Sequence, residues 1–304
     1  MTAEPEDTRP CPLCKGVALT PVFYPPLVRC SQCGLVFRNL GGLQERVREG
    51  FKTIYSQPAV EQWVQDRRVL LYRQFLARHH PAPGRNRLLD VGCGAGHFLA
   101  LARERGWDVM GVEIAEAGAE AARAAGLPVL VASLPSAALP ESSFDLVTFW
   151  NLLDCVPDPL EQVRAAKRVL APAGRFFVRV NNLTLHSALY RLSRFLRPRP
   201  RAGDRLLKPY FFNQISFSAW TLRRTLEQAG FVRIEIGNSP PVYGDPYRVI
   251  PRGGDRLVQG LKRSVHGLAW SVAAMTGGRL LWASSLVAEA VNDGTDAARG
   301  IREA

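Results

Sequence analysis

The strongest constraint on the fold is a strand, a glycine-rich turn and a helix that are followed by a second strand. The first apolar run ends in Asp90 and enters a G-x-G-x-G turn made of Gly92, Gly94 and Gly96. A helical stretch follows, and the next apolar run ends in Glu113. Glycines let a ligand approach the backbone closely, and the first turn of a helix adds free N–H groups. Because a carboxylate at the tip of the second strand can accept hydrogen bonds from ribose hydroxyls, the segment predicts a nucleotide cofactor site.

The spacing of these glycines separates two classes of cofactor. Dinucleotide-binding domains carry G-x-G-x-x-G, whose open turn makes room for a pyrophosphate. Here the third glycine comes one residue earlier and Asp90 stands before the loop, where a carboxylate repels pyrophosphate and suits a cationic ligand with an amino group. The alternative is a doubly wound domain in which the glycines only shape a turn. The acid pair Asp90 and Glu113 weighs against that alternative.

Three stretches of the chain resemble class I S-adenosylmethionine (SAM) dependent methyltransferases. LDVGCGAG, residues 89–96, is similar to motif I of that family. Residues 144–182 resemble its fourth and fifth strand region, and residues 217–231 resemble the helix before its sixth strand. The resemblance covers residues 85–240. It implies an α/β, doubly wound, Rossmann-like fold with a seven-stranded, mostly parallel sheet, and a methyl transfer that uses SAM.

The resemblance assigns part of the site to SAM. It gives Asp90 and the loop of Gly92, Gly94 and Gly96 to the amino acid end, and Glu113 to both ribose hydroxyls. Ser133 and Leu134, after the third strand, stand where the family contacts adenine. The chain departs from the family here, because the acidic residue usual in that stretch is missing. Backbone groups would then hold the adenine.

The end of the fourth strand is the next expected contact. Trp150 and Asn151 fall near the methyl group or the methionine moiety, although packing is an equal alternative for Trp150. Where the family commonly has a Glu-His pair, this chain has Asp154 and Cys155, so the imidazole that could act as general base is gone. Asp154 keeps a carboxylate for that role, or it caps a turn.

Two further residues are candidates for the general base. His186 and Tyr210 follow the fifth strand, where acceptor-binding loops enter the family's site. A lone histidine is more often structural. Each of the two residues is therefore weighed against a purely structural role.

Four of the six cysteines form a C-x2-C-x15-C-x2-C pattern, which is the spacing of a zinc ribbon. Two tight turns would each present two thiolates and leave no open position on a Zn²⁺ ion, so the site should be structural. The alternative, two disulfides, needs an oxidising compartment. The four residues are Cys11, Cys14, Cys30 and Cys33.

Composition narrows the setting of the protein. The chain has 304 residues and a net charge of +12, from 39 basic and 27 acidic residues. Nearly all the basic residues are arginine, a bias that often follows genome composition and is weak evidence for nucleic acid. The polar, acidic N-terminus does not read as a secretory signal, and no run reaches the roughly 18 apolar residues of a membrane span. We expect a cytoplasmic protein without a transmembrane segment.

The chain divides into four expected regions. They are a zinc ribbon over residues 1–42, a helical linker or lid over 43–84, the methyltransferase domain over 85–292 and a disordered tail over 293–304. Alternating strands and helices in the large region indicate a parallel sheet. The apolar runs predict strands over residues 87–92, 108–113, 128–132, 144–150, 174–180, 231–236 and 279–291.

Two helices carry clear end signals. Asp158 can cap a helix that has Pro159 in its first position and Glu161 as the partner of a capping box. A second helix is expected over residues 218–229, where Gly230 supplies a glycine C-cap.

Two stretches bear on the acceptor. An arginine run over residues 191–205 could clamp phosphates or an anionic surface, or it could be a solvated loop. Residues 256–275 place apolar residues at helical spacing, which indicates packing across the sheet or contact with a membrane surface. The arginines are Arg191, Arg194, Arg197, Arg199, Arg201 and Arg205, and the apolar residues are Leu257, Leu261, Val265, Leu268 and Val272.

The sequence thus predicts a SAM-dependent methyltransferase with a structural Zn²⁺ site. The expected acceptor is a small molecule, such as a sugar, a lipid-linked intermediate or a secondary metabolite, and the arginine run leaves open an anionic one. An RNA methyltransferase is the first alternative, because ribosomal RNA enzymes also join a Cys-rich module to this fold. A non-catalytic SAM-binding scaffold is the second.

Overall fold

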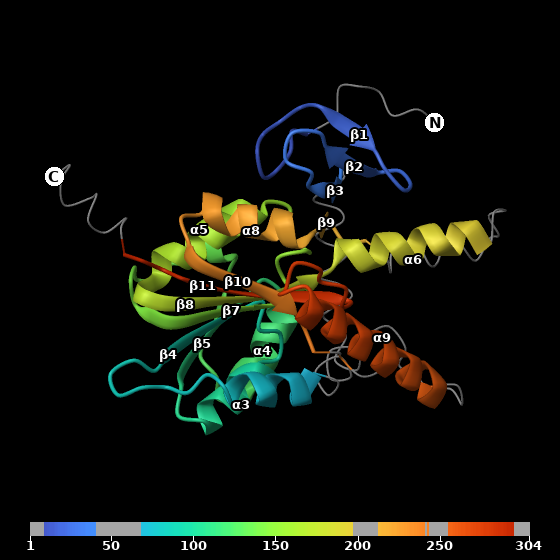
Figure 1. Ribbon diagram of the computed structural model, residues 1–304. Helices are drawn as coiled ribbons and strands as arrows, with labels where there is room; N and C mark the ends of the chain where they lie inside the picture. Colours follow the sequence, from blue (N-terminus) through green and yellow to red (C-terminus); the bar gives the residue numbers. More distant parts are fainter. Residues whose placement is uncertain (1–8, 41–67, 197–211, 241, 243–254, 295–304) are drawn as a thin grey trace.

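The structure, a computed structural model, describes residues 9–40, 68–196, 212–240, 242 and 255–294 (Figure 1). The expected helical region over residues 43–84 is therefore seen only in part, and residues 68–76 of it are helical. Residues 41–67 and the tail from residue 295 lie outside the described residues, so the division into four regions stays a prediction.

A seven-stranded sheet forms the centre of the molecule, and its strand order is β10-β11-β8-β7-β4-β5-β6. The pairs β4–β5, β4–β7, β5–β6 and β7–β8 are parallel, whereas β11 runs antiparallel to both β8 and β10. This confirms the predicted fold class. The strands are β4 (Arg87–Val91), β5 (Asp108–Glu113), β6 (Val129–Val131), β7 (Phe144–Trp150), β8 (Leu170–Asn181), β10 (Val232–Asn238) and β11 (Ser285–Val291).

Helices cover both faces of the sheet, because its central strands are apolar on both sides. One buried cluster joins Leu146 and Phe177 to residues 68–76, α3 and α4; the other joins Val147 and Phe176 to α5 and α8. Figure 1 shows α5 and α8 on one side of the sheet and α3 and α4 on the other. The helices are α3 (His97–Glu104), α4 (Glu116–Ala124), α5 (Pro159–Val169), α6 (Leu183–Leu196), α8 (Ala219–Gln228) and α9 (Asp255–Met275).

The N-terminal segment forms a small sheet of β1 (Leu19–Pro21), β2 (Leu27–Cys30) and β3 (Val36–Arg38). Its fourth strand, β9 (Ile215–Ser216), comes from the large domain and pairs antiparallel with β3. The Arg38 amide also donates to the Gln214 carbonyl at 2.9 Å. The Cys-rich module is therefore hydrogen-bonded into the large domain.

Most predicted ends of elements agree with the structure. The Asp158 carboxylate accepts from the Glu161 amide at 3.2 Å and so caps α5, although the reciprocal bond of a capping box is absent from the described contacts. Ser218 caps α8 with a full capping box, and Gly230 follows it at φ +84°.

Two expectations about the C-terminal half were wrong, and a third was wrong in part. The strand expected over 279–291 begins only at β11, since residues 279–284 form turns and irregular backbone. The arginine run was expected to be a solvated loop or an anion clamp, but Arg191 and Arg194 lie on α6, so this part is not a loop. Arg197, Arg199, Arg201 and Arg205 lie outside the described residues, and the clamp stays a prediction. In α9, the buried contact is Ala269, whereas Val265 and Leu268 are exposed rather than packed on the sheet. Contact of that exposed face with a membrane stays a prediction.

Replacement of Phe37 by alanine should destabilise the protein by about 3–5 kcal/mol, because the ring is fully buried in the cluster shared with α5 and α8. Urea unfolding followed by circular dichroism measures the change. Val17→Ala, in the same module but 82% exposed, is the matched control and should shift stability by less than about 0.5 kcal/mol. Equal stabilities for the two variants would contradict a shared core.

Candidate functional site

The glycine turn and Glu113 meet at the carboxyl edge of the sheet. The Gly94 amide donates to one Glu113 oxygen at 2.9 Å, and the Ile114 and Ala115 amides donate to the other at 2.8 Å. Gly96 caps α3 at φ +80°, where a Cβ would come within 2.4 Å of the Leu127 side chain. The loop therefore needs its glycine, and the Glu113 carboxylate is fixed beside the backbone that the sequence assigned to the cofactor.

Asp90 lies in the same place, at the end of β4. Its side chain is 2% exposed and accepts a hydrogen bond of 2.7 Å from the Thr148 hydroxyl. Burial, opposed by that bond and reinforced by the charge of Glu113, raises the pKa of Asp90 to about 8. A buried carboxylate of this kind is stabilised by a cationic ligand group.

Ser133 and Leu134 follow β6, two strands along from the glycine turn. The Ala132 amide donates to the Glu113 carbonyl at 3.1 Å, which holds this segment against the end of β5. The Ser133 hydroxyl bonds the Ser136 hydroxyl at 2.7 Å, and Leu134 is buried at the start of a short 3₁₀ turn. The structure thus brings the expected adenine segment to the edge that carries Asp90 and Glu113.

Trp150 and Asn151 end β7 beside the glycine turn. Trp150 is 5% exposed and sits in a ring cluster, while its indole Nε1 has no hydrogen-bond partner in the described part of the chain. Asn151 adopts φ +57°, and its side-chain oxygen accepts from the Arg179 guanidinium. The rings around Trp150 are Tyr72, Phe75, Phe98 and Phe177.

Asp154 has no solvent exposure, and its hydrogen bonds are internal. One carboxylate oxygen accepts from the Asn181 amide at 3.2 Å and from the Asn213 side chain at 2.7 Å. Its carbonyl accepts from the Ile215 amide at 3.0 Å. Burial raises the pKa of Asp154, and the hydrogen bonds from Asn181 and Asn213 oppose part of that rise. This environment favours a structural role over that of a general base.

The two remaining candidates for a base are placed less fully. His186 is half-buried on α6, and its amide donates to the Asn182 carbonyl in the first turn of that helix. Tyr210 lies outside the described residues. The structure therefore brings together the expected cofactor residues and leaves the identity of a base as a prediction.

Arg179 is the residue at this edge that the sequence analysis missed. It lies on β8, is 5% exposed, and is the register partner of Trp150 on β7. The signal was present, because a charge in the otherwise apolar run FFVRV marks a position that packing alone does not explain.

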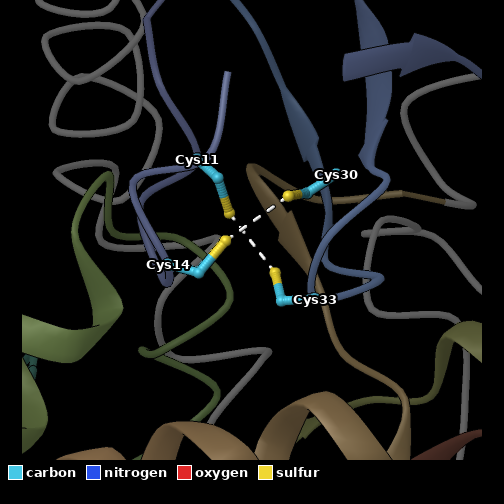
Figure 2. A group of neighbouring side chains, drawn as sticks. All are labelled: Cys11, Cys14, Cys30 and Cys33. Atoms are coloured by element: carbon cyan, nitrogen blue, oxygen red, sulfur yellow. Dashed lines mark hydrogen bonds between the residues drawn. The ribbon is translucent and has the colours of Figure 1, made fainter. Parts of the chain in front are cut away.

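The side chains of the four clustered cysteines point toward one another (Figure 2), and their sulfurs lie within 4.8 Å of one another. The Sγ atoms of Cys11 and Cys33 are 3.5 Å apart, and those of Cys14 and Cys30 are 3.4 Å apart. All six cysteines are free, so the disulfide alternative is wrong. A Cβ on Gly16 would lie 3.3 Å from the Cys14 sulfur, so the turn closes tightly round the cluster. Four thiols at these distances fit a tetrahedral Zn²⁺ ion.

The described part of the chain contains no helix that is both long and apolar enough to cross a membrane.

Comparison with known proteins bears on the same region. Residues 63–236 match the family model described as a methyltransferase domain. A ubiquinone biosynthesis O-methyltransferase of Methylococcus capsulatus is 31% identical over 170 residues, which cover 53% of this chain and 70% of that protein. The enzyme of the same name from Idiomarina loihiensis is 34% identical over 122 residues, which cover 38% of this chain and 50% of that protein.

Two solved structures share the fold. A SAM-dependent methyltransferase of Thermotoga maritima, described as a possible histamine N-methyltransferase, has a TM-score of 0.51 at 20% identity, covering 82% of this chain and 99% of its own. A chain of the complex between the Haloferax volcanii Trm112 activator and a putative methyltransferase has a TM-score of 0.53 at 18% identity, covering 81% and 97%.

Replacement of Asp154 by alanine should destabilise the protein by about 2 kcal/mol or more, because the Asn181 amide and the Asn213 side chain lose their acceptor. Urea unfolding measures the loss, and hydrogen exchange of residues 213–215 locates it. Asp154→Asn keeps the shape and one acceptor, so it should cost less. An alanine variant as stable as the wild type would contradict the structural role.

Proposed function

Because the chain belongs to the family of SAM-dependent methyltransferases, we propose that it transfers the methyl group of SAM to an oxygen of a small-molecule acceptor. The observation that carries the proposal is the meeting of Asp90, the glycine turn and Glu113 at one edge of the sheet, with Asn151 on the adjacent strand end. The names of the two relatives, both O-methyltransferases, support an oxygen as the methylated atom. The expected sugar, lipid-linked and secondary-metabolite acceptors stay open within this proposal.

SAM, when bound, supplies an electrophilic methyl group. We propose that the Asp90 carboxylate receives the ammonium group of SAM and that Glu113 receives the ribose hydroxyls. Ser133 and Leu134 would hold the adenine through their backbone, in line with the absence of a nearby acid. The hydrogen bonds that already fix Glu113 mean that little reorganisation accompanies binding.

Alignment is the main contribution the protein makes to methyl transfer, because the acceptor must attack in line with the departing sulfur. The ring cluster holds Trp150 rigidly, and the Arg179 bond holds Asn151, so the end of β7 is a fixed wall for the methyl group. The internal bonds of Asp154 make it a positioning residue in this proposal. His186 and Tyr210 stay candidates for the base.

We also propose that Cys11, Cys14, Cys30 and Cys33 hold a structural Zn²⁺ ion. The support is the closeness of the four sulfurs and the burial of three of the residues. The role proposed for the ion is to hold the ribbon, and through β9 the segment that Asp154 anchors.

Affinity for S-adenosylhomocysteine should depend on pH through the protonation of Asp90. The carboxylate is the form that binds an ammonium group, and burial raises the pKa to about 8, so affinity for S-adenosylhomocysteine should rise roughly ten-fold between about pH 6.5 and 8.5. Calorimetry measures it. Asp90→Asn should bind roughly ten-fold more weakly at the upper pH and lose the pH dependence.

The same variant carries its own folding check. A raised carboxyl pKa means that the wild type without ligand loses stability as pH rises from about 4 towards 8, and Asp90→Asn should not lose it. Asp108→Asn, an exposed acid at the opposite end of β5, is the matched control and should behave as wild type. An Asp90→Asn variant with unchanged affinity would sink the proposed role.

Removal of zinc should disrupt the ribbon and leave the cofactor site nearly unchanged. Cys30→Ser should lower bound zinc from one equivalent to near none and expose β3 and β9 to hydrogen exchange, because metal binding and folding are coupled in such sites. Affinity for S-adenosylhomocysteine should change less than about three-fold, because Glu113 on β5 holds the glycine turn, whereas the ribbon pairs with β9. Cys155→Ser, outside the cluster, is the control. A zinc-free Cys30→Ser variant whose β3 and β9 stay as protected from hydrogen exchange as in the wild type would contradict a structural role for the ion.

A further inference from the structure

The carboxyl edge of β8 holds a buried positive charge that the cofactor assignment does not use. Arg179 is only 5% exposed, and its guanidinium donates to the Ser239 hydroxyl at 2.8 Å and to the Asn151 side-chain oxygen. Both acceptors are uncharged. Among the described residues, Arg179 forms no ion pair, and its Nη2 donates no hydrogen bond.

No acid among the described residues forms an ion pair with Arg179. Asp154 acts on Arg179 only through space, because its carboxylate is engaged by Asn181 and Asn213. Arg68, at the start of residues 68–76, brings a second positive charge close enough to oppose that of Arg179. Burial and this neighbour lower the pKa of Arg179 to about 9. A buried, uncompensated guanidinium is costly to keep and is normally paired.

A second donor beside Arg179 also lacks a partner. Trp150 and Arg179 are register partners on parallel strands, so their side chains leave the sheet on the same face. The Trp150 indole Nε1 is buried and makes no hydrogen bond with the described residues. Buried donors of this kind are rare, and an unmet one calls for an explanation.

The position of the two donors indicates which ligand they meet. The sheet order places β8 beyond β7 on the side away from β4, β5 and β6. Asp90 on β4, Glu113 on β5 and Ser133 just after β6 are proposed for SAM. Asn151 directly follows β7, between these residues and Arg179. A molecule that takes the methyl group at Asn151 therefore reaches Arg179 next.

We propose that Arg179 and the Trp150 indole bind an oxyanion, a carboxylate or phosphate, carried by the methyl acceptor. This inference rests on the proposed function, because that function supplies the position of the cofactor. A planar guanidinium with free donors suits an oxyanion, and the bond to Asn151 ties recognition of the acceptor to the residue beside the methyl group. The site would then select acidic acceptors over neutral ones of the same shape.

Inorganic phosphate is the probe for the test, applied to the full zinc-loaded chain at constant ionic strength. Phosphate binding is measured by calorimetry, without and then with saturating S-adenosylhomocysteine. We expect Arg179→Gln to weaken phosphate binding about ten-fold or more and Trp150→Phe to weaken it about three-fold. Arg175→Gln, which changes an exposed arginine near the middle of β8, should bind as wild type.

The cofactor's own carboxylate is the rival source of the oxyanion, and the second arm separates the two. If phosphate binds equally well beside S-adenosylhomocysteine, the site belongs to the acceptor. If S-adenosylhomocysteine abolishes phosphate binding, and Arg179→Gln also weakens the binding of S-adenosylhomocysteine, the site holds the cofactor carboxylate and the proposal is overturned.

Two further outcomes are decisive. Phosphate binding that does not depend on Arg179 would overturn the proposal whatever the cofactor does. Failure of S-adenosylhomocysteine to bind, with Arg179-dependent phosphate binding intact, would instead overturn the proposed function and leave an oxyanion site. Should Arg179→Gln fail to fold, Arg179→Lys and Trp150→Phe give the same reading, since lysine keeps the charge and loses the planar fork.

Discussion

The buried carboxylate of Asp154 joins three parts of the chain that are far apart in sequence. It follows β7, accepts from the Asn181 amide at the end of β8, and accepts from the Asn213 side chain just before β9. Since β9 completes the ribbon sheet, Asp154 helps to fix the position of the ribbon, together with the β3–β9 pairing and the shared core. A fully buried carboxylate is tolerated because its partners repay part of the desolvation cost, which is why a single residue can fix the geometry of so much backbone.

Two buried charges of opposite sign lie at the same edge and are both shifted towards neutrality. Burial raises the pKa of Asp90 to about 8 and lowers that of Arg179 to about 9. Each group lacks a charged partner within 4.0 Å among the described residues, and β7 separates the strands that carry them. Such groups store unfavourable desolvation energy in the empty protein, which ligands of complementary charge can release. The edge is thus arranged for one cationic and one anionic ligand group on either side of Asn151.

The parts of this arrangement that the sequence predicted are local ones. The glycine turn, the Asp158 cap and the Gly230 stop each depend on residues within a few positions of one another, so their signals are contiguous. The cysteine spacing is equally self-contained. The ribbon's fourth strand was out of reach, because β9 has only two residues and lies far along the chain from β3. Arg179 was missed for a related reason: within an apolar run, only its neighbours from other elements reveal that the charge lacks a partner.

The predictions for α6 and α9 failed because the residue types of each segment suggested one arrangement and its buried side chains show another. Arginines in α6 suggested a loop, yet leucines at helical spacing and Leu183 and Leu185, which are buried, are sufficient to form the helix. In α9 the apolar stripe was expected to face the sheet, but the helix packs through Ala269, whose carbonyl accepts from the Asn238 side chain at 3.0 Å. A small residue allows the backbone to approach the sheet closely, and one polar bond then decides which face turns inward. The hydrophobic pattern of a helix predicts that a stripe exists; the orientation of that stripe depends on the bonds made by its neighbours.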